Sequence, residues 1–207
     1  MTNSASTTYY HLSPASSAET TTNAATWTSD NGEVYTLNNT GAKPAQIVGS
    51  PKLLFDGVAH YLQATFTLNQ PMSYYVVAKR PTFSTNGYFI DGNTGANVSI
   101  RNQPTTPDFD IYAGSATGIN SNWAENSYNV IMAIINGASS SSKVGATAAV
   151  SGNAGANNAG GLTVGAAGNG TSPTNIQIKE IIVRTISDST ATQIQIYSYL
   201  KAIHGAP

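Results

Sequence analysis

Short runs of apolar or alternating residues, each of strand length, recur along this chain and are separated by turn-forming residues. Asn-Gly and Asp-Gly pairs stand between several of them, and these residues tolerate the positive φ of tight turns. The runs cover residues 52–55, 61–68, 72–79, 88–91, 98–101, 109–112, 128–136, 143–150, 162–164 and 176–184. Ten strands in a chain of 207 residues predict an all-β fold, built as a two-sheet antiparallel sandwich.

The last segment departs from this strand pattern. Its apolar residues recur at spacings near three and four, which is the period of a helix. They are Ile194, Ile196, Tyr197, Leu200 and Ile203. We therefore expect one short C-terminal helix over about 189–204, capped by Asp188 or Ser187 and ended by Gly205. The Gly- and Ala-rich stretch 145–170 has no such stripe, and it predicts a narrow β-hairpin with a loose tip.

Charged residues are few, and this excludes several classes of protein. Lys plus Arg number 9 and Asp plus Glu number 10, or 9% of the chain, whereas about 25% is usual. Without a basic run, neither nucleic-acid binding nor docking on an anionic membrane is expected. No apolar run approaches the ~20 residues that span a bilayer. With 0 Cys, disulfides, thiolate metal sites and a cysteine nucleophile are excluded.

A single compact domain is expected at this length. Residues 1–26 are rich in Ser, Thr and Ala around one apolar patch. We interpret them as an N-terminal arm with a possible first strand, and residues 27–207 as the sandwich domain. The first residues have neither the basic start nor the apolar stretch of a secretory signal.

Six short motifs follow one another in a recognisable order. They lie at 27–32 (WTSDNG), 53–57 with 61–62 (LLFDG and YL), 134–137 (IING), 162–165 (LTVG), 178–183 (IKEIIV) and 187–205. In this order they resemble the concanavalin A-like lectin/glucanase superfamily, in particular its laminin G-like branch of phage structural and bacterial surface proteins. The resemblance implies a jelly roll, in a family that includes sugar binders, hydrolases and structural modules. It also implies that Glu180 makes a structural hydrogen bond next to the terminal helix.

Catalytic and metal sites have little support in the sequence. Glycoside hydrolysis requires two carboxylates, and Asp108 and Asp110 are the only acids spaced by two. Their alternation with apolar neighbours points both toward solvent, which we interpret as evidence against catalysis. The segment from Asp91 to Asn93, together with Asp108, offers too few oxygen ligands for a calcium cage. We therefore expect no enzymatic activity, no metal and no cofactor.

Sugar binding needs an exposed aromatic plate beside amides or carboxylates. Trp123 stands among Asn122, Glu125 and Asn126, so these four residues form a candidate carbohydrate-binding group. The alternative is that the Trp123 ring tucks under the sheet.

These features predict a non-enzymatic structural protein of a virion, such as a phage head decoration or a fibre-type module. It would be made in the host cytoplasm and released by lysis. It would act as a homo-oligomer or in many copies, contacting other virion subunits through Tyr9, Tyr10 and Leu12. The alternative function is a lectin-like module that attaches to a host or cell-surface glycan through Trp123.

Overall fold

The computed structural model describes residues 9–12, 26–28, 34–36, 45–46, 52–95, 97–103, 108–115 and 120–206. Its elements, in chain order, are β1 (Tyr9–Leu12), β2 (Thr26–Thr28), β3 (Val34–Thr36), β4 (Ala45–Gln46), β5 (Leu53–Asp56), β6 (Leu62–Thr65), β7 (Met72–Lys79), β8 (Tyr88–Asp91), β9 (Ser99–Asn102), β10 (Asp108–Tyr112), β11 (Asn120–Asn122), β12 (Asn129–Ile135), the short 3-10 helix η2 (Gly137–Ser139), β13 (Ser140–Val144), β14 (Val150–Gly152), β15 (Gly161–Val164), β16 (Asn175–Arg184) and α1 (Thr190–His204). Each of the ten predicted runs overlaps a strand.

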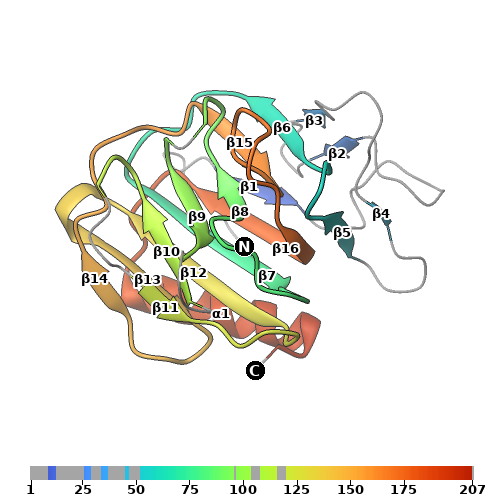
Figure 1. The fold of residues 1–207 in the computed structure, drawn as a ribbon. Coiled ribbons are helices and arrows are strands. Elements are labelled where there is room, and N and C mark those ends of the chain that lie inside the picture. The colour runs from blue at the N-terminus through green and yellow to red at the C-terminus, as the bar shows by residue number, and fades with distance from the viewer. Residues whose placement is uncertain are drawn as a thin grey trace.

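The strands form two antiparallel sheets that face one another (Figure 1). Sheet A has the order β14-β13-β12-β7-β16-β5-β4, with β1 also paired to β16. Sheet B has the order β11-β10-β9-β8-β15-β6-β3-β2. Early strands pair with late ones, such as β7 with β16 and β6 with β15. The predicted all-β, two-sheet jelly-roll sandwich with one C-terminal helix is confirmed.

The core lies between the sheets and follows the alternation of side chains along each strand. In β16, Ile176 and Ile178 face this core, and a register shift follows between Ile178 and Glu180. Beyond the shift, Ile181 and Val183 face the core while Ile182 faces the opposite side. Residues 181–183 are therefore covered on both sides of the sheet.

Helix α1 covers the outer face of sheet A. Figure 1 shows it in red alongside β12 and β7. Ile196 and Leu200 are its buried residues, and they pack in one cluster with sheet residues that include Tyr75 and Met132. The predicted cap was wrong, because Ser189 is the N-cap and its side chain accepts a hydrogen bond from the Thr192 N–H.

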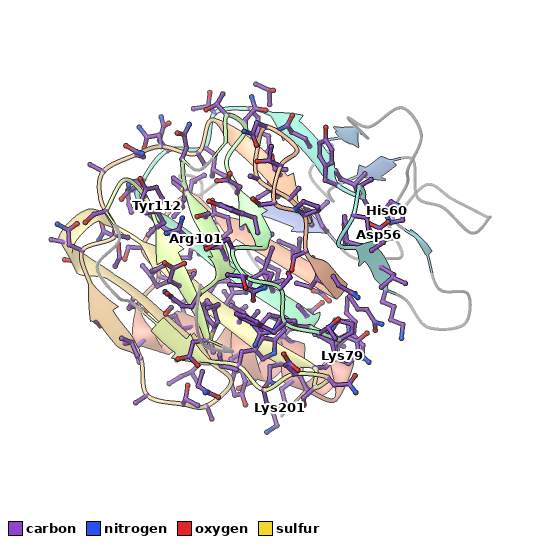
Figure 2. The ribbon with its side chains drawn as sticks, viewed as in Figure 1. Asp56, His60, Lys79, Arg101, Tyr112 and Lys201 are labelled. Atoms are coloured by element: carbon purple, nitrogen blue, oxygen red, sulfur yellow. The ribbon has the colours of Figure 1, made fainter. Side chains whose placement is uncertain are left out.

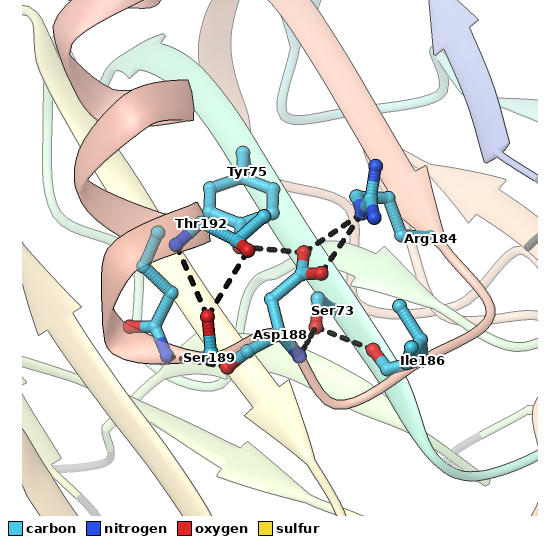
Figure 3. A network of polar contacts seen from close by, with 8 residues as sticks. Ser73, Tyr75, Arg184, Ile186, Asp188, Ser189 and Thr192 are labelled. Carbon is cyan, nitrogen blue, oxygen red and sulfur yellow. Dashed lines mark hydrogen bonds and ion pairs between the residues drawn. The ribbon is translucent and has the colours of Figure 1, made fainter. Parts of the chain in front are cut away.

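A polar network fixes the start of the helix to sheet A (Figure 3). The Asp188 carboxylate accepts a hydrogen bond from the Tyr75 hydroxyl at 2.8 Å and pairs with Arg184 Nε at 2.9 Å. The Asp188 N–H donates to Ser73 Oγ, which donates to the Ile186 carbonyl. Burial, together with the charge of Asp188, raises the pKa of Tyr75. The network therefore joins the chain before α1 to both β7 and β16.

The predicted hairpin over 145–170 is wrong. β14 pairs with β13 in sheet A, whereas β15 pairs with β6 and β8 in sheet B, so the segment crosses from one sheet to the other. Ala154 and Ala159 are buried, and a Cβ at Gly155 would lie 2.2 Å from the carbonyl oxygen of Ala113. Small residues are needed here for close backbone packing rather than for a loose tip.

β1 is the described part of the predicted arm. It pairs with residues 181–184 of β16, on the edge that β5 occupies further along the same strand. The possible first strand at Tyr9–Leu12 therefore belongs to the sandwich. Residues 1–8 and 13–25 lie outside the described ranges, and the boundary after residue 26 stays a prediction.

Candidate functional site

The outer faces of the two sheets are covered differently. Helix α1 lies over sheet A, but in the part of the chain that the structure describes no helix lies over sheet B. The loop after β15 covers part of this face, because Gly168 hydrogen-bonds with Gln63 and Asp91, so a ligand would reach the side chains nearer the β11 edge. Many of them are polar or charged.

Six of these side chains form a group that we call the outer strip. They are Tyr88, Arg101, Asp108, Asp110, Tyr112 and Asn122. Phe109 and Ile111 point into the core, so the residues that alternate with them on β10 must point outward. Strand pairing then places Arg101 opposite both Asp110 and Tyr88, and Asn122 opposite Asp108.

Arg101 is the centre of the outer strip. Its Nε and Nη2 donate to the two carboxylate oxygens of Asp110 at 2.9 and 3.2 Å, and its Nη1 donates to the Tyr88 hydroxyl at 3.2 Å. The guanidinium carbon lies 4.8 Å from the centroid of the Tyr112 ring and 5.8 Å from that of Tyr88. Figure 2 shows Arg101 beside Tyr112. The guanidinium is therefore held from several sides.

The electrostatics of this group keep Arg101 charged. Burial opposes the charge, but the hydrogen bonds and negative charge of Asp110, with a further hydrogen bond to Tyr88, outweigh it and raise the pKa of Arg101. The side chains of Arg101 and Asp110 are 21% and 7% exposed. The expectation that Asp110 faces solvent is thus corrected: it lies on the outer face, but its partners enclose it.

The strip ends at Asn122 on the edge strand β11. Asn122 Nδ2 donates to Asp108 Oδ1 at 2.9 Å. Beside Asn122 lies an open hollow of about 420 Å³, whose lining includes Asn129, Gly145 and Thr147. The charged strip therefore meets, at this edge of the sheet, a hollow whose lining is mixed and also includes Ala124, Val144 and Ala146.

Trp123 is not an exposed plate. Its side chain is 0% exposed, its ring meets Phe89 edge-on at a centroid distance of 5.2 Å, and the Arg80 guanidinium lies 4.9 Å above it. Because Asn122 points outward from an extended strand, the next residue points inward. The candidate role of Trp123 in sugar binding is wrong, and the alternative of a tucked ring is confirmed.

Glu125 and Asn126 hold the loop after Trp123. Glu125 Oε1 accepts a hydrogen bond from the Phe83 N–H at 2.8 Å, and the Asn126 N–H donates to the Arg80 carbonyl at 2.7 Å. Asn126 also has a positive φ of 57°, a conformation that Asn tolerates. Of the four predicted sugar-binding residues, Asn122 is the one that lies in the outer strip.

The predicted docking patch is also corrected at one position. Leu12 is 0% exposed and belongs to the core between the sheets. It lies opposite Ile181 of β16, so it stabilises its own sandwich and cannot reach a partner. The side chains of Tyr9 and Tyr10 lie outside the described residues.

Asp91, a candidate calcium ligand, is enclosed as well. Its two carboxylate oxygens accept hydrogen bonds from the N–H groups of Gly92 and Gly168, and they hold the loop after β15 against sheet B. Among the residues described here, no group of three His, Cys, Asp or Glu side chains is arranged to hold a metal ion. The described helices also include none long and apolar enough to cross a membrane.

Sequence reasoning missed Arg101, Tyr88 and Tyr112. One signal was present, because Tyr112 alternates with Asp110 on a predicted strand. The partner was not visible, since Arg101 reaches Asp110 only when β9 and β10 pair in this particular register.

Comparison with known proteins gives similarity of fold alone. No family model matches this chain, and no curated protein matches it. Trypanosoma rangeli sialidase in complex with sialic acid is 12% identical, with a TM-score of 0.65 over 95% of this chain and 33% of the sialidase. An arabinofuranosidase complexed with arabinofuranosyl-alpha-1,2-xylobiose is 10% identical, with a TM-score of 0.68 over 87% of this chain and 51% of that enzyme. The chain thus spans between one third and about one half of these proteins.

These neighbours overturn the expectation that the chain has no enzymatic activity. Both are glycosidases, so this type of sandwich occurs in enzymes that cleave glycans. The laminin G-like resemblance stays a prediction.

Proposed function

We propose that this chain recognises carbohydrate through the outer strip of sheet B. The observation that carries the proposal is the setting of Arg101, which is paired with Asp110 and lies against Tyr112 on the face of sheet B that no described helix covers. This group combines a ring, a guanidinium and a carboxylate within one small area. Such a combination suits a ligand that has both apolar ring faces and hydroxyl groups.

Within the described part of the chain, the hydrogen bonds of Arg101 leave some of its N–H donors for a ligand. A guanidinium has five N–H donors, and Asp110 and Tyr88 occupy three of them. The remaining donors lie on the two terminal nitrogens, next to the half-buried ring of Tyr112. Because the guanidinium is already held in place, a sugar that binds it loses little additional side-chain entropy.

The solved structures with this fold support the same class of ligand. One is a complex with sialic acid and another a complex with arabinofuranosyl-alpha-1,2-xylobiose. Their low identity means that they suggest sugars as a class and no particular sugar.

A glycan panel tests the proposal directly. The folded wild-type chain should bind one or more glycans. Tyr112→Ala removes the aromatic ring and Arg101→Lys removes the planar guanidinium, so each should weaken that binding by at least about tenfold. Gln195→Ala changes an exposed residue on α1 and should leave binding unchanged. No binding by the wild type, or full binding by Tyr112→Ala, would overturn the proposal.

Hydrolysis of the bound glycan is a second candidate function. Asp108 and Asp110 lie on one face of β10, so their carboxyl groups project from the same side of the sheet. Glycosidases use carboxylate pairs separated by about 5 to 9.5 Å. Release of reducing sugar from a bound glycan should therefore fall in both Asp108→Asn and Asp110→Asn. If the wild type binds a glycan without cleaving it, hydrolysis fails and recognition stands.

Location on a virion stays a prediction. Its test is the mass of the native assembly: tens of copies in one particle would support it, whereas a lone monomer would contradict it.

A further inference from the structure

Three lysines surround one tyrosine on the outer face of sheet A. Lys52 precedes β5, Lys79 ends β7 and Lys179 lies within β16, while Tyr128 directly precedes β12. The ammonium nitrogens of Lys52, Lys79 and Lys179 lie 5.9, 5.6 and 4.3 Å from the centroid of the Tyr128 ring. All three ammonium nitrogens lie within 5.9 Å of the same ring centroid. The distance between any two of these nitrogens is therefore less than twice that value.

This concentration is unusual for the chain. Its sequence has 6 Lys, and half of them gather here from three separate strands or their ends. Like charges brought together repel one another, and each loses part of its hydration. The effect is visible at Lys179, where burial and the neighbouring charge of Lys52 lower the pKa.

No acidic side chain of the described ranges pairs with these lysines. The carboxylates that form ion pairs are matched with other cations: Asp56 with His60, Glu180 with His204, Asp110 with Arg101 and Asp188 with Arg184. A negative group that balances the cluster would therefore come from outside the described structure.

Part of the cluster, namely Tyr128 and Lys179, is held in place by hydrogen bonds within the chain. The Tyr128 hydroxyl donates to Gln177 Oε1 at 2.8 Å, and Lys179 Nζ donates to the His204 carbonyl at 3.2 Å. The ring and one ammonium group are thus fixed, while Lys52 and Lys79 have no such bond among the described residues. Two movable cations beside one fixed cation can close around a small anion.

We propose that Lys52, Lys79 and Lys179 form a binding site for an oxyanion, namely the sulfate or phosphate group of a ligand. A lysine ammonium is a compact charge with three donors that binds such oxygens. A single exposed ion pair contributes little, but three that converge on one group act together. The site is independent of the outer strip, and Figure 2 shows Lys79 well away from Arg101 and Tyr112.

The test is a titration with inorganic sulfate and with inorganic phosphate, followed by NMR at an ionic strength held constant with chloride. Saturable shifts are expected at Lys52, Lys79, Tyr128 and Lys179. The double variant Lys52→Gln/Lys79→Gln should lose at least about tenfold in affinity, and it removes neither fixed hydrogen bond. Lys143→Gln, which removes one charge from β13, is the matched control and should titrate like the wild type.

Polymers then identify the source of the anion. Binding of dextran sulfate but not of neutral dextran, lost in the double variant, would support a sulfated polymer as the ligand. Binding of the inorganic ions alone would support a free anion. Shifts that do not saturate, that appear equally at Lys143, or that persist in the double variant would overturn the site. None of these results depends on the outer strip.

Discussion

The two sheets each carry one Arg–Asp ion pair on their outer faces, and the two pairs have similar local geometry. In sheet A, Arg184 Nε lies 2.9 Å from Asp188 Oδ2, and the two side chains are 19% and 2% exposed. In sheet B, Arg101 Nε lies 2.9 Å from Asp110 Oδ1, and the two side chains are 21% and 7% exposed. The difference is in what each pair joins. Asp188 also binds Tyr75 and fixes a helix, whereas Asp110 joins two adjacent strands of an open face.

The two ion pairs therefore have similar burial but different neighbours. In the sheet A pair, Asp188 also binds Tyr75 and Ser73 of β7, next to the start of α1. The sheet B pair is bordered by the ring of Tyr112, and some Arg101 N–H groups have no hydrogen bond to another described residue. The following predictions test whether one face serves stability and the other serves binding.

The largest effect on stability is expected where α1 covers sheet A. Leu200→Ala should lower the free energy of unfolding by about 3 kcal/mol, because it leaves a cavity under the helix. Ile203→Ala, on the exposed side of the same helix, should change it by less than about 0.5 kcal/mol. Urea unfolding measures both, and similar values for the two variants would show that α1 is not the cover described here.

The second effect compares the ion pairs directly. Asp188→Ala should cost about 2 to 3 kcal/mol, since it leaves the Tyr75 hydroxyl and Arg184 without their partner in a buried place. Asp110→Ala should cost about half as much, because it removes the carboxylate from Arg101 but leaves no buried hydroxyl without its acceptor, as Asp188→Ala does at Tyr75. Equal losses in urea unfolding would remove the distinction between the two faces.

The third effect concerns alkaline pH. The pKa of Tyr75 is raised in the folded state by burial and by Asp188. The folded protein therefore keeps this proton where the unfolded chain, with its ordinary pKa of about 10, loses it. This stabilisation is present below about pH 10 and declines as pH rises further. Unfolding measured from pH 8 to pH 11 should show a shallower decline for Tyr75→Phe, and an unchanged slope would contradict this.

Apart from the control Ile203→Ala, the smallest effect on stability is expected at Tyr112. Tyr112→Ala removes a half-buried ring from the outer face of sheet B and should cost about 1 kcal/mol or less, whereas the proposed glycan binding should weaken by at least about tenfold. A loss as large as that of Leu200→Ala would assign Tyr112 to structure instead. Thermal unfolding and the glycan panel, measured on the same sample, decide between the two.

The strands were the most predictable part of the molecule. β7 and β8 have the bounds that the sequence indicates, because their apolar runs end at clear breaks such as Pro71 and Gly92. The segment over 145–170 was not predictable in this way. Its glycines and alanines allow the backbone to pack closely against a strand that is distant in the sequence. The local sequence does not show which strand that is.

The candidate site was predictable only in part. Asp108, Asp110 and Asn122 were visible as polar residues on or near strands, and the alternation placed both acids on the outer face. Trp123 was misassigned because its side-chain direction depends on Asn122, which precedes it and points outward at the end of a three-residue strand. So short a strand was not recognised in the sequence. Arg101 was not considered, since a lone arginine on a strand has no partner until the neighbouring strand is placed.

The sequence by itself determined the class of fold and the final helix, because alternation and turn residues act over a few neighbouring positions. Only the tertiary structure decided which charges meet. Arg101 and Asp110 come together through the register of two strands, and Lys52, Lys79 and Lys179 through the order of three strands in a sheet. Electrostatic interactions depend on distance in space, and distance in space between remote positions exists only once the sheets have formed.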